Sequence, residues 1–372
     1  MLGPGRTQLP FLLKVLAAEA PLSLQVHPDA EQARTGFARE NQAGLALDAL
    51  ERNYRDESHK PELILALSPS FEALVGFQHV SMIRMLLSEL VMAAGDDRQP
   101  ISDFAERLAA GDPALAGSTG SAVDVGQFGA PDSPTTTADF VGRGNPLEQT
   151  VEWLLHGGQD VDELIAAVTV AVRRAPRTSA FLKEFSTVQR LADVFPGDPG
   201  IVLSLLMNRV TLQQGQALYL PAGSLHAYLE GLGIELMAAS DNVLRGGLTE
   251  KHVDVEELLR VVRFEALPSP VVTPESPAPG ITVFHPDAGD FVLAQIALGT
   301  AAAVHGVTLT GPESTGFTLA GPAIVLAVSG GMQVQGAAGG TDLGSGDAVY
   351  ITPDEGALTF TGSGVAFVAT TP

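Results

Sequence analysis

The sequence predicts a mainly β protein that is interrupted by an α-helical insertion. Short hydrophobic strand patterns occupy both ends of the chain, whereas apolar residues recur at a helical spacing of about 3.6 residues through its middle. The 40 glycines and 25 prolines supply the frequent turns of a strand-rich protein. Because 372 residues exceed one average domain, we expect two or three packed units.

The first part of the chain, residues 1–78, is expected to contribute strands to a β-barrel. Residues 8–27 hold two extended apolar segments separated by Ala-Glu-Ala-Pro, a pattern typical of buried strands. Asp29 is a helix-capping residue, and Leu and Ala follow it at helical spacing as far as residue 52. Residues 62–67, ELILAL, predict another buried strand.

A helical insertion is predicted over residues 79–200. Its segments VSMIRMLLSELVMAA, ISDFAERLAAG, LEQTVEWLLH, VDELIAAVTVAVRRA and SAFLKEFSTVQRLADVF all carry apolar residues at helical spacing. A stretch at 117–146 is rich in Gly, Ser, Thr, Pro and Asp, and it predicts a surface loop between two of these helices.

Strand character returns over residues 201–266, in the segments RVTLQQGQALYLP and GIELMAAS, and a short helix is predicted at 255–262. Residues 267–280 carry five prolines, which favours an extended connector or domain boundary. Residues 281–372 combine short strands, Gly-rich turns and few charges, and they predict a second, C-terminal β domain.

The composition excludes several classes of protein. The formal net charge is −22 and no basic patch interrupts it, so we expect no nucleic-acid partner. There is no cysteine, so any metal must be bound by His, Asp, Glu or amide groups. We see no signal peptide and no apolar run of the roughly 20 residues that span a bilayer. We therefore expect a cytoplasmic monomer with no membrane partner.

Two candidate metal ligands lie two residues apart in the predicted strand that ends at Pro28. Side chains two apart in a strand point to the same face, so Gln25 and His27 would present an amide oxygen and an imidazole side by side. Taken alone, this pattern also fits a histidine that is simply hydrogen-bonded at a strand end.

A carboxylate opens the next predicted strand in the sequence His59-Lys60-Pro61-Glu62. Pro61 favours an extended Lys60, so Lys60 and Glu62 share one face and His59 takes the other. A buried carboxylate needs a partner, which a metal ion or a lysine would provide. An exposed Lys–Glu pair at the entrance of a strand is the alternative.

The most specific pattern is Gly215-(x)5-Pro221-x-Gly223-(x)2-His226, which fits the second cupin motif at each spacing. Gly215 turns the chain, QALYL forms a barrel strand, and a tight turn then leaves His226 pointing into the barrel. A β-hairpin with an incidental histidine is the alternative. Residues 346–353, GDAVYITP, resemble residues 215–221, GQALYLP, as two related barrels in one chain would.

A buried carboxylate and a loop-held arginine follow His226. Glu235 lies within an apolar strand and again needs a partner. Arg245 is bracketed by Ser-Asp-Asn and Gly-Gly, so it could make a bidentate contact with a phosphate or an enediolate oxygen. A structural salt bridge from Arg245 to Asp241 is equally compatible. Three cations near one pocket, Lys60, Arg245 and Lys251, indicate an anionic ligand in this acidic chain.

Three blocks resemble the signature sequences of the type I mannose-6-phosphate isomerases: PFLLKVLAAEAPLSLQVHP, HKPE and LPAGSLHAYLEGLGIELMAASDNVLRGGLTEKHVDV. The resemblance covers residues 1–78 and 200–262 through motifs and the rest through its layout. It implies a cupin (jelly-roll) barrel, a helical domain and a second cupin-like β domain. It also implies an N-terminal segment with Tyr-x-Trp-Gly and Glu-Leu-Trp motifs, which this sequence does not contain.

The resemblance further implies an activity and a set of site residues. The activity is the zinc-dependent interconversion of mannose 6-phosphate and fructose 6-phosphate, through proton transfer in a cis-enediol. One Zn²⁺ per chain would be bound by Gln25, His27, Glu62 and His226. Catalytic roles would fall on Arg245, Glu235 and Lys60, with Glu235 and Lys60 both candidates for the base, and substrate contacts on Ser23, Tyr228 and Lys251.

Two other kinds of function are compatible with parts of the pattern. A cupin that binds a metal or a sugar without turning it over would carry the same ligands. Iron dioxygenases and sugar-phosphate epimerases on the same fold usually show a His-x-His pair, and Gln25 takes the place of the first histidine here. A role in mannose use and one in the supply of GDP-mannose both remain open.

Overall fold

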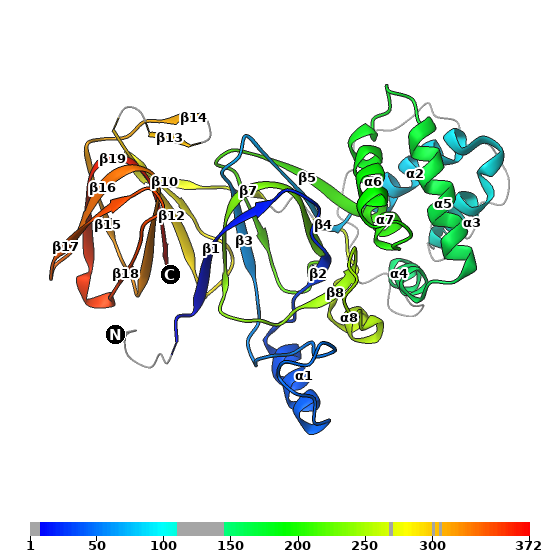
Figure 1. The fold of residues 1–372 in the computed structure, drawn as a ribbon, viewed down its shortest axis with the longest axis horizontal. Coiled ribbons are helices and arrows are strands. Elements are labelled where there is room, and N and C mark those ends of the chain that lie inside the picture. The colour runs from blue at the N-terminus through cyan, green and yellow to red at the C-terminus, as the bar shows by residue number, and fades with distance from the viewer. Residues whose placement is uncertain (1–7, 110–144, 268–270, 300–301, 305–306) are drawn as a thin grey trace.

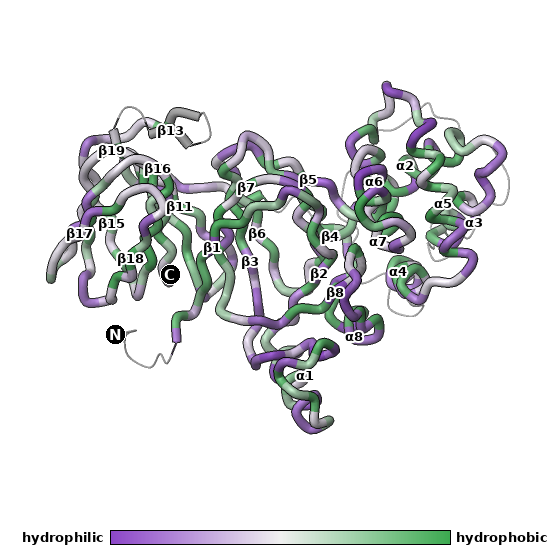
Figure 2. The backbone as a smooth tube through the Cα atoms, in the orientation of Figure 1, coloured by the Kyte–Doolittle hydropathy of each residue, from purple (hydrophilic) through white to green (hydrophobic). Residues whose placement is uncertain are grey.

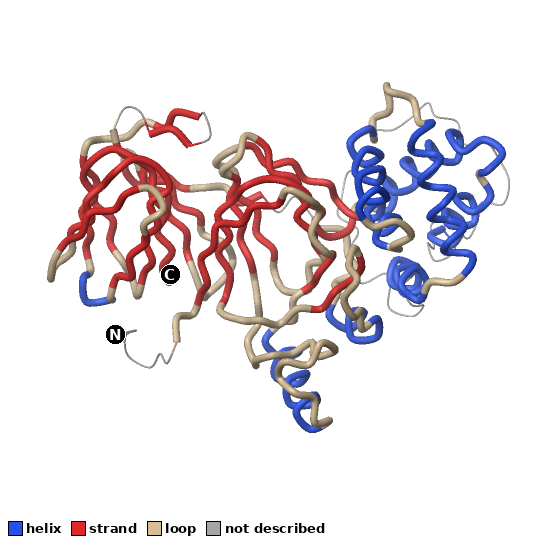
Figure 3. Tube along the Cα trace, in the orientation of Figure 1, coloured by secondary structure: helices blue, strands red, loops and turns tan. Residues whose placement is uncertain are grey.

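Two curled sheets lie side by side, and a group of helices lies beyond the end of the first sheet (Figures 1 and 3). The predicted fold class, mainly β with an α-helical insertion, is confirmed. The domain boundaries expected from the sequence stay a prediction. The computed structural model describes residues 8–109, 145–267, 271–299, 302–304 and 307–372, so the loop predicted at 117–146 lies almost wholly outside the described residues.

The first sheet, here called the central sheet, has nine strands among the described residues, and all their pairings are antiparallel. β7 is its longest strand, and it pairs with β4 and β2 near its start but with β1 and β3 further along. This change of partners curls the sheet into a half-barrel. The strands are β1 (Phe11–Ala18), β2 (Leu24–Val26), β3 (Glu62–Ala66), β4 (Ser70–Phe77), β5 (Met207–Gln213), β6 (Ala217–Leu220), β7 (His226–Ala238), β8 (Leu244–Gly247) and β9 (Val271–Val272).

Alternation along the strands decides which side chains enter the half-barrel. In β3, Ile64 packs inside with Tyr228 and Leu220, whereas Leu63 and Leu65 point outward. Glu62 lies two residues before Ile64 and therefore shares its inward face. In β7 the flanking Ile234 and Leu236 pack outward, so Glu235 also points inward. The outward residues pack against the second sheet, where hydrophobic residues recur along the facing strands (Figure 2).

The prediction of two buried strands over residues 8–27 is wrong in part. Both strands form, but β1 pairs only with β7 among the described residues and much of its length is exposed. Val15 is 53% exposed and Leu12 is 36% exposed, because β1 lies at an edge of the sheet. Hydrophobic composition indicated a strand correctly but did not reveal this edge position.

The helices form where the apolar spacing predicts them, with one difference in length. Asp29 caps α1 (Ala30–Gln42), and its carboxylate accepts hydrogen bonds from the main-chain N–H groups of Glu31 and Gln32. The predicted helix to residue 52 instead ends at Gln42, and Gly44 has a positive φ of 77° just beyond it. The other helices are α2 (Val80–Ala94), α3 (Gln99–Ala109), α4 (Pro146–His156), α5 (Gln159–Arg174), α6 (Leu182–Val194), α7 (Gly200–Leu203) and α8 (Val255–Val261). Within the part of the chain that the structure describes, none is long and apolar enough to cross a membrane.

The second sheet contains eight strands among the described residues, and a separate hairpin lies beside it. The part of the predicted connector that the structure describes from residue 271 onward contains two short strands, and it joins both sheets because β9 pairs with β6 and the next strand, β10, pairs with β11. The elements are β10 (Glu275–Ala278), β11 (Ile281–Phe284), β12 (Val292–Leu298), β15 (Ser314–Thr318), β16 (Ala323–Gln335), β17 (Gly340–Gly344), β18 (Ala348–Ile351) and β19 (Ala357–Thr370), with the hairpin strands β13 (Ala302–Val304) and β14 (Val307–Leu309).

The two similar sequence motifs adopt the same local structure in the two sheets. Gly215 has a φ of 81° immediately before β6, and Gly346 has a φ of 92° immediately before β18. A positive φ is easily adopted only by glycine, so both motifs place a turn at the same point before a strand. A common origin of the two sheets stays a prediction.

Candidate metal centre

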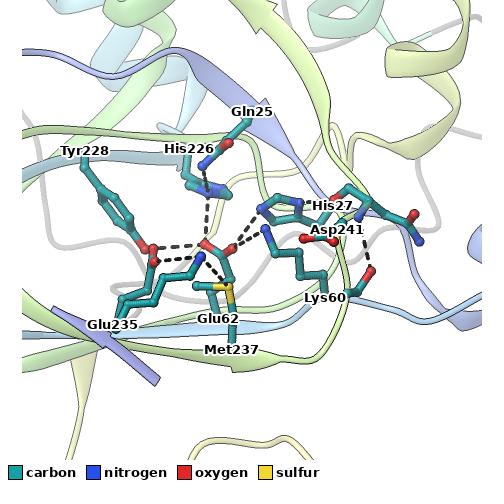
Figure 4. Close-up of polar contacts among 12 residues, drawn as sticks. Gln25, His27, Lys60, Glu62, His226, Tyr228, Glu235, Met237 and Asp241 are labelled. Carbon is teal, nitrogen blue, oxygen red and sulfur yellow. Dashed lines mark hydrogen bonds and ion pairs between the residues drawn. The ribbon is translucent and has the colours of Figure 1, made fainter. Parts of the chain in front are cut away.

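Three side chains from three separate segments meet inside the half-barrel: His27, Glu62 and His226. Nε2 of His27 lies 3.0 Å from Oε1 of Glu62, and Nε2 of His226 lies 3.4 Å from Oε2 of the same carboxylate. The candidate ligand atoms of the three residues lie within 4.8 Å of one another. All three side chains are at most 3% exposed, so these polar groups are shielded from bulk solvent (Figure 4).

Local backbone geometry brings the two histidines together. Gly223 has a φ of 84° in the turn after β6, and its N–H donates a hydrogen bond to the carbonyl oxygen of His27 at 2.9 Å. β7 begins at His226, which pairs directly with Gln25 of β2. The turn that the sequence motif predicts therefore contacts one histidine and positions the other.

The hydrogen bonds of the two histidines determine which ring nitrogens are free. Nδ1 of His27 lies 2.8 Å from the carbonyl oxygen of Asn242, and Nδ1 of His226 lies 2.9 Å from that of Ser224. A carbonyl oxygen only accepts, so each Nδ1 carries the proton. In the neutral rings, both Nε2 lone pairs then point toward the Glu62 carboxylate.

This arrangement places three electron-pair donors together without a proton between them. Nε2 of His27 is buried and has no hydrogen-bond partner among the described residues, although a carboxylate oxygen lies 3.0 Å away. Such groups repel one another unless a cation lies between them. Because Nε2 of His27 has no hydrogen-bond partner in the described part of the chain, these residues fit a bound metal ion. In metal-binding histidines the other ring nitrogen typically donates a hydrogen bond to a carbonyl oxygen, as Nδ1 does in both His27 and His226.

The electrostatics keep the ligands in their metal-binding protonation states. Burial lowers the pKa of His27 to about 4, although the charge of Glu62 opposes this effect, so the ring is neutral at pH 7. Burial alone would raise the pKa of the Glu62 carboxyl, but the neighbouring His27, Lys60 and His226 side chains hold that pKa well below its usual value. Neutral imidazoles and an ionised carboxylate are the donors that Zn²⁺ takes in the absence of thiolates.

Gln25 lies beside the three donors, as the alternation along its strand predicts. Its Nε2 lies 3.3 Å from Nε2 of His226. Rotating the amide by a half-turn would exchange its nitrogen for its oxygen at this position. The side chain is therefore placed to offer a fourth, oxygen ligand.

Lys60 provides the positive charge nearest to the carboxylate. Its Nζ lies 3.1 Å from Oε1 of Glu62, and the residue is 8% exposed. The expectation that Lys60 and Glu62 share one face is confirmed by this contact. His59 points the other way, toward the second sheet, where its Nε2 lies 2.8 Å from Oδ2 of Asp290.

Glu235 and Tyr228 project from β7 toward the same carboxylate. The Tyr228 hydroxyl donates to Oε2 of Glu62 at 3.5 Å, and burial followed by the charges of Glu62 and Glu235 raises the pKa of the phenol well above its usual value. Burial and the charge of Glu62 also raise the pKa of Glu235 to about 7, against the effect of Lys14 and Lys60. Glu235 is thus a carboxyl group that can both release and accept a proton near neutral pH.

Lys14 is a neighbour of the site that sequence reasoning missed. It pairs with Glu235 across β1 and β7, and its Nζ lies 3.9 Å from Oε2 of that residue. No local sequence signal marks Lys14, because its position opposite Glu235 depends on how two distant strands are paired.

The remaining predicted residues lie around the three donors. Arg245 is in β8 opposite Gln25, and burial together with the charge of Arg55 lowers the pKa of its guanidinium. No ion pair joins Arg245 to Asp241 or to another carboxylate within the described ranges, which is against a structural salt bridge. Ser23 is half-buried before β2 and Lys251 is exposed after β8. Among the residues that the structure describes, neither side chain forms a hydrogen bond or an ion pair with the three donors.

Known proteins with similar sequences are mannose-6-phosphate isomerases. Residues 3–80 match the model of the phosphomannose isomerase type I catalytic domain. The mannose-6-phosphate isomerase of Escherichia coli K12 is 36% identical over 262 residues, which is 70% of this chain and 56% of that protein. The same enzyme of Bos taurus is 30% identical over 300 residues, covering 78% of this chain and 61% of that protein. The aligned regions therefore span less than two thirds of these curated relatives.

Solved structures extend the similarity over nearly the whole chain. A variant of phosphomannose isomerase from Salmonella typhimurium aligns with a TM-score of 0.76 and 30% identity, covering 98% of this chain and 79% of that one. A zinc-bound mannose 6-phosphate isomerase aligns with a TM-score of 0.75 and 29% identity over similar fractions.

The curled sheet with two histidines and a glutamate inside it defines a cupin-type protein with a metal-ligand cluster. Within that class, the sequence and structural matches together show the family. The chain belongs to the type I phosphomannose isomerases.

Proposed function

We propose that this protein interconverts mannose 6-phosphate and fructose 6-phosphate, with one Zn²⁺ bound by His27, Glu62, His226 and the amide oxygen of Gln25. The activity and the metal are supported by the names of the relatives and by the zinc-bound neighbour. The observation that carries the proposal is the convergence of two Nε2 lone pairs on a buried carboxylate. A protein would pay a large desolvation cost for this arrangement without a cation.

The reaction moves one hydrogen between C1 and C2 of the open-chain sugar phosphate. A base removes the proton from the carbon next to the carbonyl, which leaves the cis-enediol in its ionised, enediolate form, and the proton of the neighbouring hydroxyl passes to the former carbonyl oxygen. Returning the proton to the other carbon completes the exchange, so no oxidant or reductant is needed. Zinc at this site would act as a Lewis acid on the oxygens of the substrate.

Glu235 is the base in this proposal. It is 5% exposed, and its pKa of about 7 allows the carboxyl group to accept a proton and return it within one turnover. Lys60 is assigned the role of a hydrogen-bond donor to a substrate oxygen, because its ammonium group already lies 3.1 Å from the carboxylate of Glu62. Tyr228 contacts that same carboxylate, and it is assigned a contact with the substrate.

The negative charges of the substrate are assigned to Arg245, with Ser23 and Lys251 at the periphery. Arg245 is half-buried, and the charge of Arg55 is close enough to lower its pKa. Two arginines with like charges repel each other unless an anion lies between or beside them. A phosphate or an enediolate oxygen would relieve this repulsion, and guanidinium groups can bind either in a bidentate manner.

The test is a coupled assay of mannose 6-phosphate conversion on zinc-loaded protein. We expect turnover in the parent and none in His226→Ala. The matched control is His156→Ala, which removes an exposed histidine of α4 and should keep parental activity. Zinc binding without turnover in the parent would indicate a metal-binding cupin that lacks isomerase activity. Absence of both would refute the proposed site.

A further inference from the structure

Asn242 lies just outside the donor cluster, and its side chain is completely buried. Its Oδ1 accepts hydrogen bonds from the main-chain N–H groups of Arg55 at 2.7 Å and Asp56 at 3.1 Å. Its Nδ2 donates to the carbonyl oxygens of Asp56 at 2.9 Å and Ser58 at 2.8 Å. The amide group thus uses its donors and its acceptor on one short segment, residues 55–58.

The same segment returns hydrogen bonds to the chain around Asn242. The Asp56 carboxylate accepts from the Ser240 hydroxyl at 2.9 Å and from the Asp241 N–H at 2.8 Å. The Ser240 hydroxyl in turn accepts from the N–H of Asn242 at 3.2 Å. Residues 55–58 and 240–242 are therefore held together by side chains from both segments, in a region that belongs to no strand or helix.

This pair of segments is continuous with three parts of the site. The main-chain carbonyl of Asn242 accepts the Nδ1 proton of His27 at 2.8 Å, which orients that ring. Residues 55–58 lead directly into Lys60 and Glu62, and residues 240–242 lead into Arg245. One buried amide thus connects the backbone that orients His27 with the backbone that positions Glu62.

We propose that Asn242 is a positioning residue for the metal centre, acting on His27 through its own main-chain carbonyl and on Glu62 through residues 55–58. The inference rests on metal binding at the site proposed above, but not on the isomerase reaction. Substituting Asn242 leaves its carbonyl oxygen in the chain. Any effect on the metal must therefore come from a displaced carbonyl and displaced segments.

Two substitutions separate this role from simple packing. Asn242→Ala removes the hydrogen bonds to residues 55–58. Asn242→Asp keeps the shape of the side chain, but it places a carboxylate oxygen against the carbonyls of Asp56 and Ser58 and near the carboxylate of Asp56. If the residue only filled space, the aspartate variant would behave like the parent. If it positions the site, both variants should be impaired, the aspartate variant at least as strongly.

The experiment measures zinc affinity by competition with a chromophoric chelator, and the absorption spectrum of cobalt(II)-substituted protein. We expect both Asn242 variants to bind zinc about 10–100-fold more weakly, which is typical when a group that orients a metal ligand through a hydrogen bond is disturbed. We also expect both variants to show altered cobalt spectra. The control is Asn145→Ala, in which an asparagine that caps α4 and donates to the carbonyl of Phe264 is lost far from the site. It should lower thermal stability and leave both metal readouts unchanged.

Folded Asn242 variants with parental affinity and spectrum would overturn the proposal while leaving the metal site intact. A parent protein that binds no metal would overturn the site itself. Should the Asn242 variants not fold, Ser240→Ala provides a milder test, because it removes one hydroxyl that bonds to both Asp56 and the N–H of Asn242. A smaller loss of zinc affinity is expected there, and an unchanged affinity would equally refute the proposal.

Discussion

Replacing Glu62 by glutamine removes the negative charge toward which His27, His226 and Lys60 all point, with little change in shape. With an effective dielectric constant of about 20, unit charges 3.1 Å apart, as in the Lys60–Glu62 pair, attract each other by about 5 kcal/mol. Desolvation offsets part of this attraction. Removing one partner of a buried pair nevertheless costs about 3–5 kcal/mol, because the other charge stays buried without compensation.

The expected effect on the metal is separate from the effect on folding. Loss of a group that only hydrogen-bonds to a metal ligand typically weakens metal binding by about 10–100-fold. Loss of a charged ligand that binds the metal itself should therefore weaken it by more than about 100-fold. That factor corresponds to more than about 2.7 kcal/mol of binding free energy. We therefore expect Glu62→Gln to lower both the stability of the metal-free protein and its affinity for zinc.

Chelator competition and denaturant unfolding measure the two effects. The double variant Lys60→Met/Glu62→Gln should recover much of the metal-free stability, since no unpaired charge remains, but it should not recover zinc affinity. Glu72→Gln is the matched control, because Glu72 forms a 2.6 Å ion pair with Arg209 in the same sheet but outside the donor cluster. Parental zinc affinity in Glu62→Gln would refute the reasoning about this site.

Three further predictions concern neighbouring residues. Lys60→Met should lower kcat by at least about 100-fold in the coupled assay while the protein still binds zinc, and loss of zinc instead would contradict its assigned role. In metal-free protein the pKa of Glu235 is raised, so the folded state binds more protons than the unfolded state between about pH 4.5 and about pH 7. The stability of the protein should therefore fall as pH rises through this range. Thermal unfolding of Glu235→Gln should not show this fall. The hydrogen bond to Asp290 raises the pKa of His59, so this ion pair should stabilise the fold below about pH 6.5 and stabilise it less as pH rises through the folded-state pKa. The Asp290→Asn variant should lose this pH dependence of stability. The stabilisation should be less than about 1 kcal/mol, because the His59 side chain is 36% exposed.

Strand alternation and motif spacing predict which side chains of a single strand or turn share a face. Two-residue periodicity placed Lys60 with Glu62 on one face, and the turn with Gly223 placed His226 at the start of an inward-facing strand. These inferences depend only on geometry within one strand or one turn. The sequence resemblance implies that Gln25 and His27 lie beside the other two candidate ligands, and in the structure Gln25 pairs with His226.

Features that depend on strand pairing were not predicted. The sequence patterns do not predict β4 (Ser70–Phe77), which lies between β5 and β7 in the central sheet. Lys14 meets Glu235 only through the register of β1 on β7. Because register is set by packing between segments more than 200 residues apart in the sequence, no local pattern identifies such neighbours.

The contacts of Asn242 illustrate the same limit in a loop. In the sequence, Asn242 is only part of a Ser-Asp-Asn run that brackets Arg245. Its amide instead bonds to a segment near residue 56, about 186 positions away in the chain. Irregular backbone must find hydrogen-bond partners somewhere, but the sequence does not state where.

Zinc-edge anomalous diffraction from crystals grown with one equivalent of zinc tests the central claim most directly. We predict one strong anomalous peak per chain, at about 2.0–2.2 Å from Nε2 of His27, Nε2 of His226 and a carboxylate oxygen of Glu62. A peak located elsewhere, or no peak between these three side chains at full zinc loading, would contradict the account.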